Sequence, residues 1–160
     1  MASRQISDLA LDLQPLATEW VRRCEAKGIK VLITCTARSY QEQLALYAQG
    51  RNPLEFTNSL RKKAGLAPIT EKENKSKVTW TMNSKHITNL LDDDKNNDKS
   101  LAWDFVILDG KTAKWDIKVD VNKNKISDYE EAGKIAEELG LEWGGRWKSP
   151  DAPHIQKKAK

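Results

Sequence analysis

The segment LAWDFVILDG, residues 101–110, constrains the fold of this chain more than any other. From Leu101 to Leu108 it is apolar except for Asp104, and its branched and aromatic side chains favour a β-strand. Asp109-Gly110 follows, a dipeptide typical of the tight turn between two antiparallel strands. We therefore predict a hairpin whose second strand lies within Lys111 to Trp115.

Three helices are predicted from apolar periodicity and from capping residues. Apolar side chains recur at three- and four-residue steps from Leu9 to Cys24, as on one face of an amphipathic helix. Ser39 with Glu42, and Ser127 with Glu130, fit the capping box that marks a helix start. The three helices are expected to end at Gly28, Gly50 and Gly140.

The remaining segments complete a mixed architecture. Further strands are expected at residues 30–36, 78–81, 141–144 and 154–156, whereas residues 51–77 are polar and are expected to form a long surface excursion with one or two helical turns. Helices mixed with short hairpin strands in this order indicate an α+β fold, with a small antiparallel sheet packed against helices. No repeat is present, and residues 1–160 are expected to form one domain.

The composition excludes some classes of protein. Hydrophobic residues make up 39% of the chain, and no apolar run reaches the roughly 20 residues of a membrane span, so membrane insertion is not expected. Asp8 and Asp12 interrupt the apolar N-terminal segment, which we therefore interpret as a helix and not as a secretory signal peptide. We expect the protein to be made in the cytoplasm.

The net charge indicates which classes of partner fit the chain, and the cysteines indicate whether a disulfide framework is expected. A net charge of +4 and a pI near 9.0 favour an anionic partner. Nucleic acid is not expected, because the basic tail KKAK is short and no basic stripe is interleaved with aromatic residues. Cys24 and Cys35 fall in apolar segments and are expected to be buried thiols, not a disulfide framework.

Three residues form a candidate metal site. His86, Asp104 and His154 supply two imidazoles and a carboxylate, a common ligand set for zinc that leaves a fourth position for water. Asp151, three residues before His154, is placed to take a proton from an attacking water and pass it to a leaving amine. Such a triple has a competing interpretation, because a lone histidine is more often a hydrogen-bonded structural residue.

Two motifs around these residues resemble those of a known family. Without the segment Asn89 to Lys99, SKHIT joins SLAWDF, which resembles the S-x-H-x-x-G-x-A-x-D signature of the LAS-type zinc peptidases. Asp104 lies 18 positions after His86, and without the 11 inserted residues the separation is 7, as in that family. The sequence DAPH, residues 151–154, matches the family's second signature, an acidic residue three positions before the last zinc histidine.

The resemblance implies a fold and a set of roles. GLEWGGRWKSPDAPHIQ and TARSYQEQLALYAQGR are similar to the two ends of the endolysin branch of this family, whose fold is the Hedgehog/D-Ala-D-Ala peptidase-like zinc fold. His86, Asp104 and His154 would then hold zinc, and Asp151 would be the general base. Arg38 would stabilise the carbonyl oxygen or hold a substrate carboxylate. From its position alone, Arg38 would be a surface charge at a helix start.

The first motif departs from the family pattern in two ways. Its glycine is replaced by Asn89 or Ser100, depending on where the insertion is drawn, so the local turn must differ. The insertion itself separates two ligands, but a loop can be lengthened without moving its ends. We therefore keep Asp104 as the ligand. The inserted carboxylates that could replace it are Asp92, Asp93, Asp94 and Asp98.

Other residues are candidates for contact with a substrate. Ser84 is expected either to bond the substrate backbone or to serve as a turn hydroxyl. Trp143 and Trp147 are expected to line the cleft beside the third ligand. For Trp143, core packing is the competing interpretation, since it lies in a short apolar strand.

Two acidic segments carry a calcium hypothesis. In DVNKNKISDYEE, five oxygen-bearing residues occupy positions 1, 3, 5, 9 and 12 of a calcium-loop pattern: Asp120, Asn122, Asn124, Asp128 and Glu131. Lys125 stands where that pattern has glycine. The insertion offers a second candidate, with alternating oxygen ligands at Asp92, Asp94, Asn96 and Asp98. Both segments also fit solvated loops.

The resemblance implies a zinc-dependent endolysin that cuts the L-alanyl-D-glutamate bond in the stem peptide of bacterial peptidoglycan. It is expected to be a monomer that is held in the host cytoplasm until lysis and then acts on the cell wall. The alternatives are a D-Ala-D-Ala carboxypeptidase or dipeptidase on the same scaffold, and a non-catalytic metal module that binds the wall.

Overall fold

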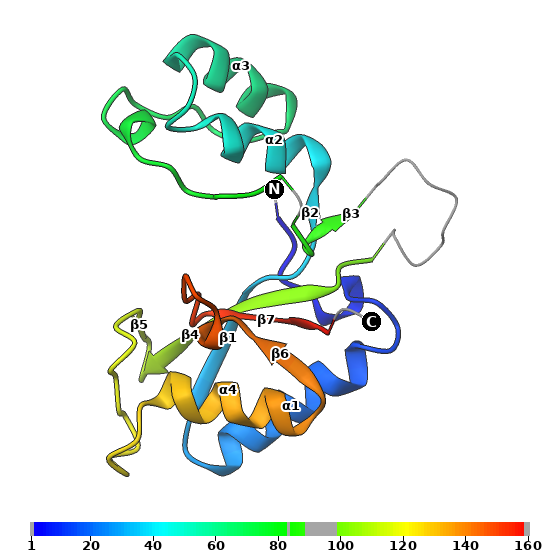
Figure 1. The fold of residues 1–160 in the computed structure, drawn as a ribbon, viewed down its shortest axis with the longest axis vertical. Helices are drawn as coiled ribbons and strands as arrows, with labels where there is room; N and C mark the ends of the chain where they lie inside the picture. Colours follow the sequence, from blue (N-terminus) through cyan, green and yellow to red (C-terminus); the bar gives the residue numbers. More distant parts are fainter. Residues whose placement is uncertain (1, 83, 89–98, 159–160) are drawn as a thin grey trace.

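The computed structural model describes residues 2–82, 84–88 and 99–158. The predicted insertion, apart from Lys99, and with it the alternative ligands and the second calcium candidate, lies outside these residues. Helices and a small, mostly antiparallel sheet are combined as the sequence predicts, so the fold is α+β (Figure 1).

A five-stranded sheet forms the centre of the molecule. Its order is β1-β4-β7-β6, and β5 pairs with the end of β4 as the predicted hairpin. All pairs in this sheet are antiparallel. The strands are β1 (Lys30–Cys35), β4 (Ala102–Asp109), β5 (Thr112–Lys114), β6 (Leu141–Trp143) and β7 (His154–Lys157).

Two helices, α1 (Gln14–Ala26) and α4 (Asp128–Glu138), cover one face of this sheet (Figure 1). Alternate residues of β4 point toward them, and Trp103, Phe105 and Ile107 are fully buried there. Trp20 of α1 packs its ring against Trp103 and Phe105. The intervening Asp104 therefore faces the other side of the sheet.

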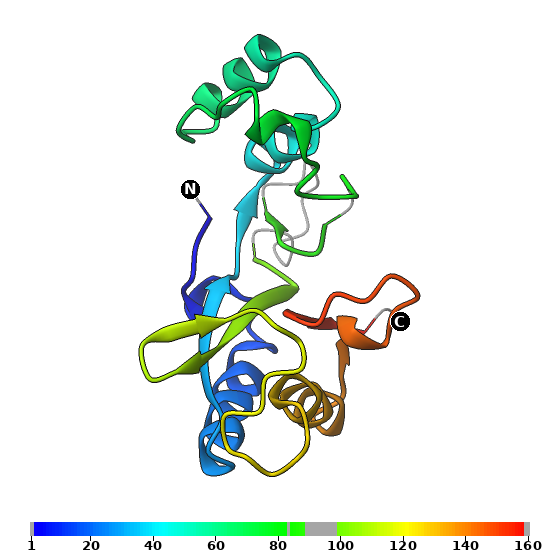
Figure 2. The ribbon, with the colours of Figure 1, turned by 90° about the vertical axis from the view of Figure 1, so that its left-hand side faces the viewer.

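The second group of elements lies on that other side (Figure 2). It contains α2 (Tyr40–Ala48), α3 (Leu54–Lys63) and a short parallel pair of strands, β2 (Arg38–Ser39) and β3 (Ile87–Thr88). The chain passes from β1 directly into β2, so this group begins at the end of a core strand. The three-residue 3₁₀ helices are η1 (Ile6–Asp8), η2 (Glu73–Lys75) and η4 (Gly144–Arg146).

The structure corrects three predictions about elements. The first helix begins at Gln14, after η1, and not at Leu9, which instead bridges to Ser100. Residues 51–77 contain the ten-residue helix α3, which is longer than one or two turns. Residues 78–81 form no strand, because side chains from α2 and the loop after it bond the backbone carbonyls of Thr79 and Thr81.

The two capping boxes have different outcomes. Ser39 caps α2 as predicted, accepting a hydrogen bond from the Glu42 N–H at 3.1 Å. Ser127 precedes α4 but donates its hydroxyl proton to the Ile117 carbonyl at 2.5 Å, so the predicted cap is wrong.

Across the residues that the structure describes, no helix has both the length and the apolar character to cross a membrane.

Candidate metal centre

The register of the sheet places two of the predicted ligands side by side. Asp104 on β4 is directly opposite His154 on β7, and it is also opposite Cys35 on β1. Directly opposed residues of antiparallel strands point to the same face of a sheet. The His154 Nδ1 and Asp104 Oδ1 atoms are consequently 2.9 Å apart.

The third predicted ligand comes from the other side of the site. His86 lies in the turn before β3, where the Ser84 hydroxyl accepts a hydrogen bond from its N–H at 3.2 Å. The His86 carbonyl accepts a bond from the Arg38 N–H at 2.8 Å and so joins the turn to β2. This arrangement places His86 Nε2 3.2 Å from Asp104 Oδ1. Ser84 thus has the role of a turn hydroxyl.

The atoms behind the two histidines orient their rings. His86 Nδ1 lies 2.9 Å from the Thr36 carbonyl oxygen, which can only accept, so Nδ1 carries a proton. His154 Nε2 lies 2.9 Å from Gln156 Oε1, and the Gln156 amide in turn donates to Glu142. Such bonds fix the tautomer of a metal-binding histidine. They turn His86 Nε2 and His154 Nδ1 toward the same carboxylate oxygen.

Burial and charge at this cluster fit a cation. His86 is 3% exposed, and its Nε2, although 3.2 Å from Asp104 Oδ1, lacks a well-directed hydrogen bond among the described residues. Burial by itself lowers the pKa of His86, but Asp104 and Cys35 raise this pKa to about 10. Burial favours a higher pKa for Asp104, yet the two histidines hold that pKa well below its usual range. The Asp104 carboxylate therefore favours a positive charge beside it, and two imidazoles with one carboxylate are a donor set suited to zinc.

Cys35 also belongs to this region, which the sequence did not indicate. Cys35, His86 and Asp104 present possible ligand atoms that all lie within 4.8 Å of one another. However, Cys35 Sγ approaches His86 at Nδ1, 3.8 Å away, and Thr36 already occupies that nitrogen. His154 is closer to the carboxylate, so we prefer it to Cys35 as the third ligand.

Arg38 lies beside Cys35 at the edge of the cluster. Its guanidinium donates to Gln43 Oε1 at 2.8 Å and lies 3.7 Å from Cys35 Sγ. The Nε atom is buried and has no hydrogen-bond partner within the described part of the chain. Arg38 is thus held close to the cluster, and its Nε–H is a donor without an acceptor among the described residues.

Asp151 lies in the loop that leads into His154. Its N–H donates to the Gly144 carbonyl at 2.8 Å. A Cβ at position 144 would lie only 2.4 Å from the backbone carbonyl oxygen of Asp151, so this close approach requires glycine there. Asp151 as a whole is exposed, but partial burial of its carboxyl group raises its pKa. The charge of Asp104 also raises this pKa, whereas His154 and His86 lower it.

A cleft of about 770 Å³ adjoins Asp151. Residues 78–81 form one wall, and Trp147 with residues 149–151 forms the other. Trp147 also lies 5.2 Å from the His154 ring, as expected for a residue beside the third ligand. Trp80 also lines this cleft and is 77% exposed. The sequence indicated only a strand at this position.

Trp143 does not line the cleft beside Asp151, but it borders a separate hollow of about 380 Å³ together with Arg146 and Trp147. It is 4% exposed, and its indole N–H donates to the Ala152 carbonyl at 2.8 Å. Its ring packs directly over Gly133 of α4. The burial of Trp143 fits the core interpretation, and its contact with a substrate stays a prediction.

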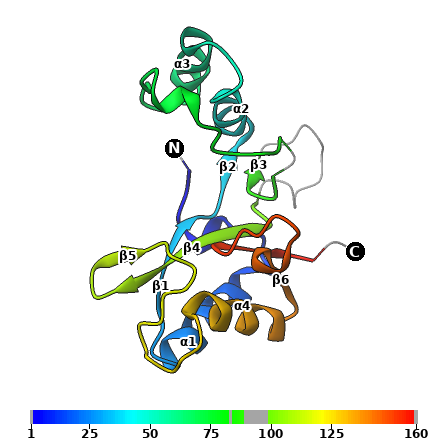
Figure 3. The ribbon, with the colours of Figure 1, turned by 60° about the vertical axis from the view of Figure 1, so that its left-hand side comes forward.

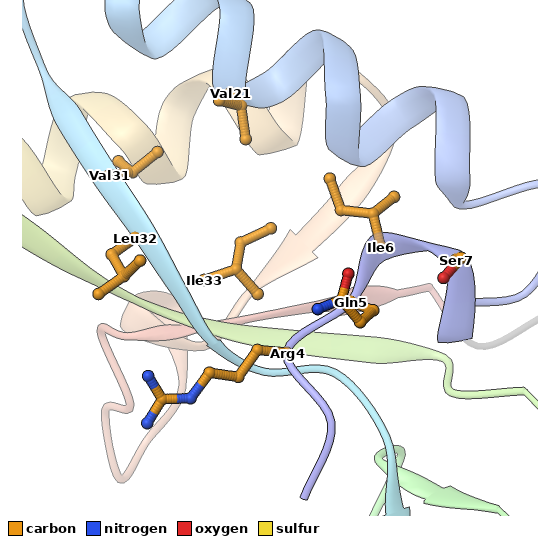
Figure 4. Close-up of a pocket in the computed structure, with 8 residues that line it drawn as sticks. All are labelled: Arg4, Gln5, Ile6, Ser7, Val21, Val31, Leu32 and Ile33. Atoms are coloured by element: carbon orange, nitrogen blue, oxygen red, sulfur yellow. The ribbon is translucent and has the colours of Figure 1, made fainter.

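A second hollow, of about 500 Å³, lies between the N-terminal segment, α1 and β1 (Figure 4). Aliphatic side chains make up most of its lining, including Ile6, Val21, Val31 and Ile33. It contains none of the residues of the metal cluster, so it is not part of this site.

Comparison with known proteins agrees with this geometry. A family profile described as D-alanyl-D-alanine carboxypeptidase matches residues 98–157, which include Asp104, Asp151 and His154. The chain is also 34% identical over 152 residues to the peptidoglycan L-alanyl-D-glutamate endopeptidase CwlK of Bacillus subtilis (strain 168), covering 91% of this chain and 73% of that protein. The chain belongs to the LAS-type peptidase family. Membership of this family identifies it as a metallopeptidase.

A solved structure supports the fold of this peptidase. The crystal structure of the Serratia marcescens L-Ala D-Glu endopeptidase ChiX matches it with a TM-score of 0.52 at 16% identity, over 99% of this chain and 89% of that one. At this identity the match concerns the fold alone. It confirms the α+β architecture predicted from the sequence.

Proposed function

We propose that this peptidase hydrolyses the L-alanyl-D-glutamate bond of the peptidoglycan stem peptide in a zinc-dependent reaction. The observation that carries the proposal is the approach of both His86 and His154 to one oxygen of Asp104, near an open cleft lined by Asp151. We take the scissile bond from the relative CwlK, which is named as an L-alanyl-D-glutamate endopeptidase.

The residues of the chain divide the chemistry between them. His86 Nε2, Asp104 Oδ1 and His154 Nδ1 would hold the zinc ion. Zinc, when bound, supplies a Lewis acid that activates water and polarises a carbonyl group. The Asp151 carboxylate would accept a proton from the attacking water and later deliver it to the amine of the leaving D-glutamate.

Arg38 and the cleft complete the proposed site. The guanidinium of Arg38 would stabilise negative charge on the carbonyl oxygen or bind a carboxylate of the substrate. Trp80 and Trp147 would bind the stem peptide across the cleft. Because all of these residues come from one chain, we propose that a monomer is active, as a phage-type lytic enzyme attracted to the anionic wall by its net charge of +4.

Purified muropeptides with intact stems test the proposal by mass analysis of the products. The proposal expects free amino groups on D-glutamate and no release of D-alanine. Release of terminal D-alanine instead would identify a carboxypeptidase, the activity named by the matching family profile. Absence of both products at full zinc occupancy would identify a binding module.

A substitution at Asp151 tests the assigned base. Asp151→Asn should lower kcat by about 100- to 10,000-fold, because proton transfer is lost, while the zinc content stays at the wild-type value. Asp116→Asn, which changes an exposed carboxylate outside the cleft, is the matched control and should leave kcat unchanged. Wild-type activity of Asp151→Asn would refute the assignment.

A further inference from the structure

Hydrogen bonds link four of the five oxygen-bearing residues in the loop before α4. The backbone N–H groups of Asn124 and Lys125 donate to the Asp120 carboxylate at 3.2 and 2.8 Å. The side-chain amides of Asn122 and Asn124 both donate to Glu131 Oε1. Positions 1, 3, 5 and 12 of the predicted calcium loop are therefore neighbours in space.

Asp128, at position 9, contributes a buried carboxylate to the same loop. It is fully buried, and its Oδ2 accepts a hydrogen bond from the Val121 N–H at 2.6 Å. Its Oδ1 has no partner among the residues that the structure describes. Burial and the nearby charges of Asp120 and Glu131 raise the pKa of Asp128, opposed by the Val121 hydrogen bond.

No cation of the described chain neutralises these carboxylates. Glu131 is 8% exposed, and the neutral amides of Asn122 and Asn124 donate to its carboxylate. The ion pairs in residues 2–82, 84–88 and 99–158 include none of Asp120, Asp128 and Glu131. Buried carboxylates are stabilised by pairing or by a metal ion, so a bound cation would stabilise Asp128 and Glu131.

The backbone of the loop has the required turn despite the missing glycine. Lys125 has a φ of 72°, in the left-handed region that glycine adopts at position 6 of a calcium loop. Lys123 also has a positive φ, of 57°. The loop is tied to the end of α1 through the Asn122 amide, which donates to the Lys27 carbonyl at 2.9 Å (Figure 3).

We infer that residues 120–131 form a calcium-binding site, separate from the zinc cluster, with side-chain oxygens of Asp120, Asn122, Asn124, Asp128 and Glu131 as ligands. Oxygen ligands in a flexible loop suit Ca²⁺, which takes six to eight of them, and do not suit zinc. The two asparagine amides would rotate to present oxygen in place of nitrogen, a change that preserves their shape. The bound ion would hold the start of α4.

Calorimetric titration of the zinc-loaded full chain with CaCl₂ tests the site without reference to hydrolysis. Zinc loading occupies the first cluster, so the heat reports on a second site. One Ca²⁺ should bind per chain, with a dissociation constant below about 1 mM. Asp120→Asn and Glu131→Gln should each weaken binding at least about tenfold, since each removes a charged oxygen ligand.

Two further variants sharpen the test. Asp116→Asn removes a carboxylate of the same segment outside the loop and should bind calcium like the wild type. Lys125→Gly should bind calcium more tightly, because it removes a positive charge and suits the left-handed backbone. Absence of binding at 10-fold the expected dissociation constant, about 10 mM, would overturn the inference. Equal weakening by Asp116→Asn and Asp120→Asn would also overturn it.

Discussion

At the scale of single residues, Gln156 is the side chain that orients His154, the proposed third ligand. It accepts from His154 Nε2 and is itself held by Glu142. Gln156→Leu keeps the approximate volume but removes the acceptor, so His154 can change tautomer. We expect zinc affinity to fall about 10- to 100-fold, measured by competition with a chelator of known affinity.

The matched control for Gln156→Leu is Lys158→Leu. Lys158 is exposed two residues further along the chain, so its replacement should leave zinc affinity unchanged. If Gln156→Leu bound zinc as tightly as the wild type, the tautomer assigned to His154 would be irrelevant to metal binding.

The sequence indicated the residues of the cluster better than the residues that support them. Motif spacing pointed to His86, Asp104 and His154, and the structure brings these three together, with Asp151 lining the cleft. The contact of Gln156 with His154 could have been suspected, because residues two apart on a strand share a face. The Thr36 carbonyl and Cys35 could not, because their approach to His86 depends on how β1 pairs with β4.

At the scale of elements, α4 packs against β6 at a position where only glycine fits. A Cβ on Gly133 would lie 2.1 Å from the Trp143 ring. Gly133→Ala should therefore lower the free energy of unfolding by about 1–3 kcal/mol, measured by chemical denaturation. Lys134→Ala, at an exposed position of the same helix, should change it by less than about 0.5 kcal/mol. Equal stability of Gly133→Ala and the wild type would contradict this packing.

The start of α4 should make stability depend on pH when calcium is absent. The pKa of Asp128 is raised from 3.8 by burial and by its acidic neighbours. Ionisation of Asp128 therefore opposes folding, and stability is lost as the pH rises through its folded-state pKa. In chelator, Asp128→Asn should have a higher Tm than the wild type at pH 7 and lose this advantage below pH 3.8.

Thermal unfolding followed by circular dichroism checks this prediction. The same comparison with Asp116→Asn gives the effect of removing an ordinary exposed carboxylate. A Tm difference for Asp128→Asn that is the same at both pH values would show that the charge of Asp128 does not oppose folding.

Elements with strong local signals were predictable, whereas those defined by distant partners were not. The hairpin after Asp109-Gly110 and the cap at Ser39 need only nearby residues, and both predictions are confirmed. Residues 78–81 have strand-forming side chains, but Arg51 and Gln43 bond their carbonyls. Ser127 resembles a helix cap but bonds Ile117, ten residues earlier. In both cases a tertiary contact replaced the local preference.

At the scale of the whole molecule, the site lies where two groups of elements meet. The sheet supplies Asp104 and His154, and the turn before β3 supplies His86 (Figure 1). The chain on both sides of the insertion is held together, because the Leu101 N–H donates to the Lys85 carbonyl at 2.8 Å. An interrupted motif can therefore still place His86 next to Asp104.

Zinc content is the most direct test of the interrupted motif. The wild-type chain, purified and dialysed against zinc-free buffer, should retain one zinc per chain by elemental analysis and should hydrolyse muropeptides. Asp104→Ala should lose both the zinc and the activity, because it removes the oxygen that both histidines face. A variant Asp104→Ala that kept one zinc and full activity would show that another carboxylate is the ligand, and that the site described around His86, Asp104 and His154 is wrong.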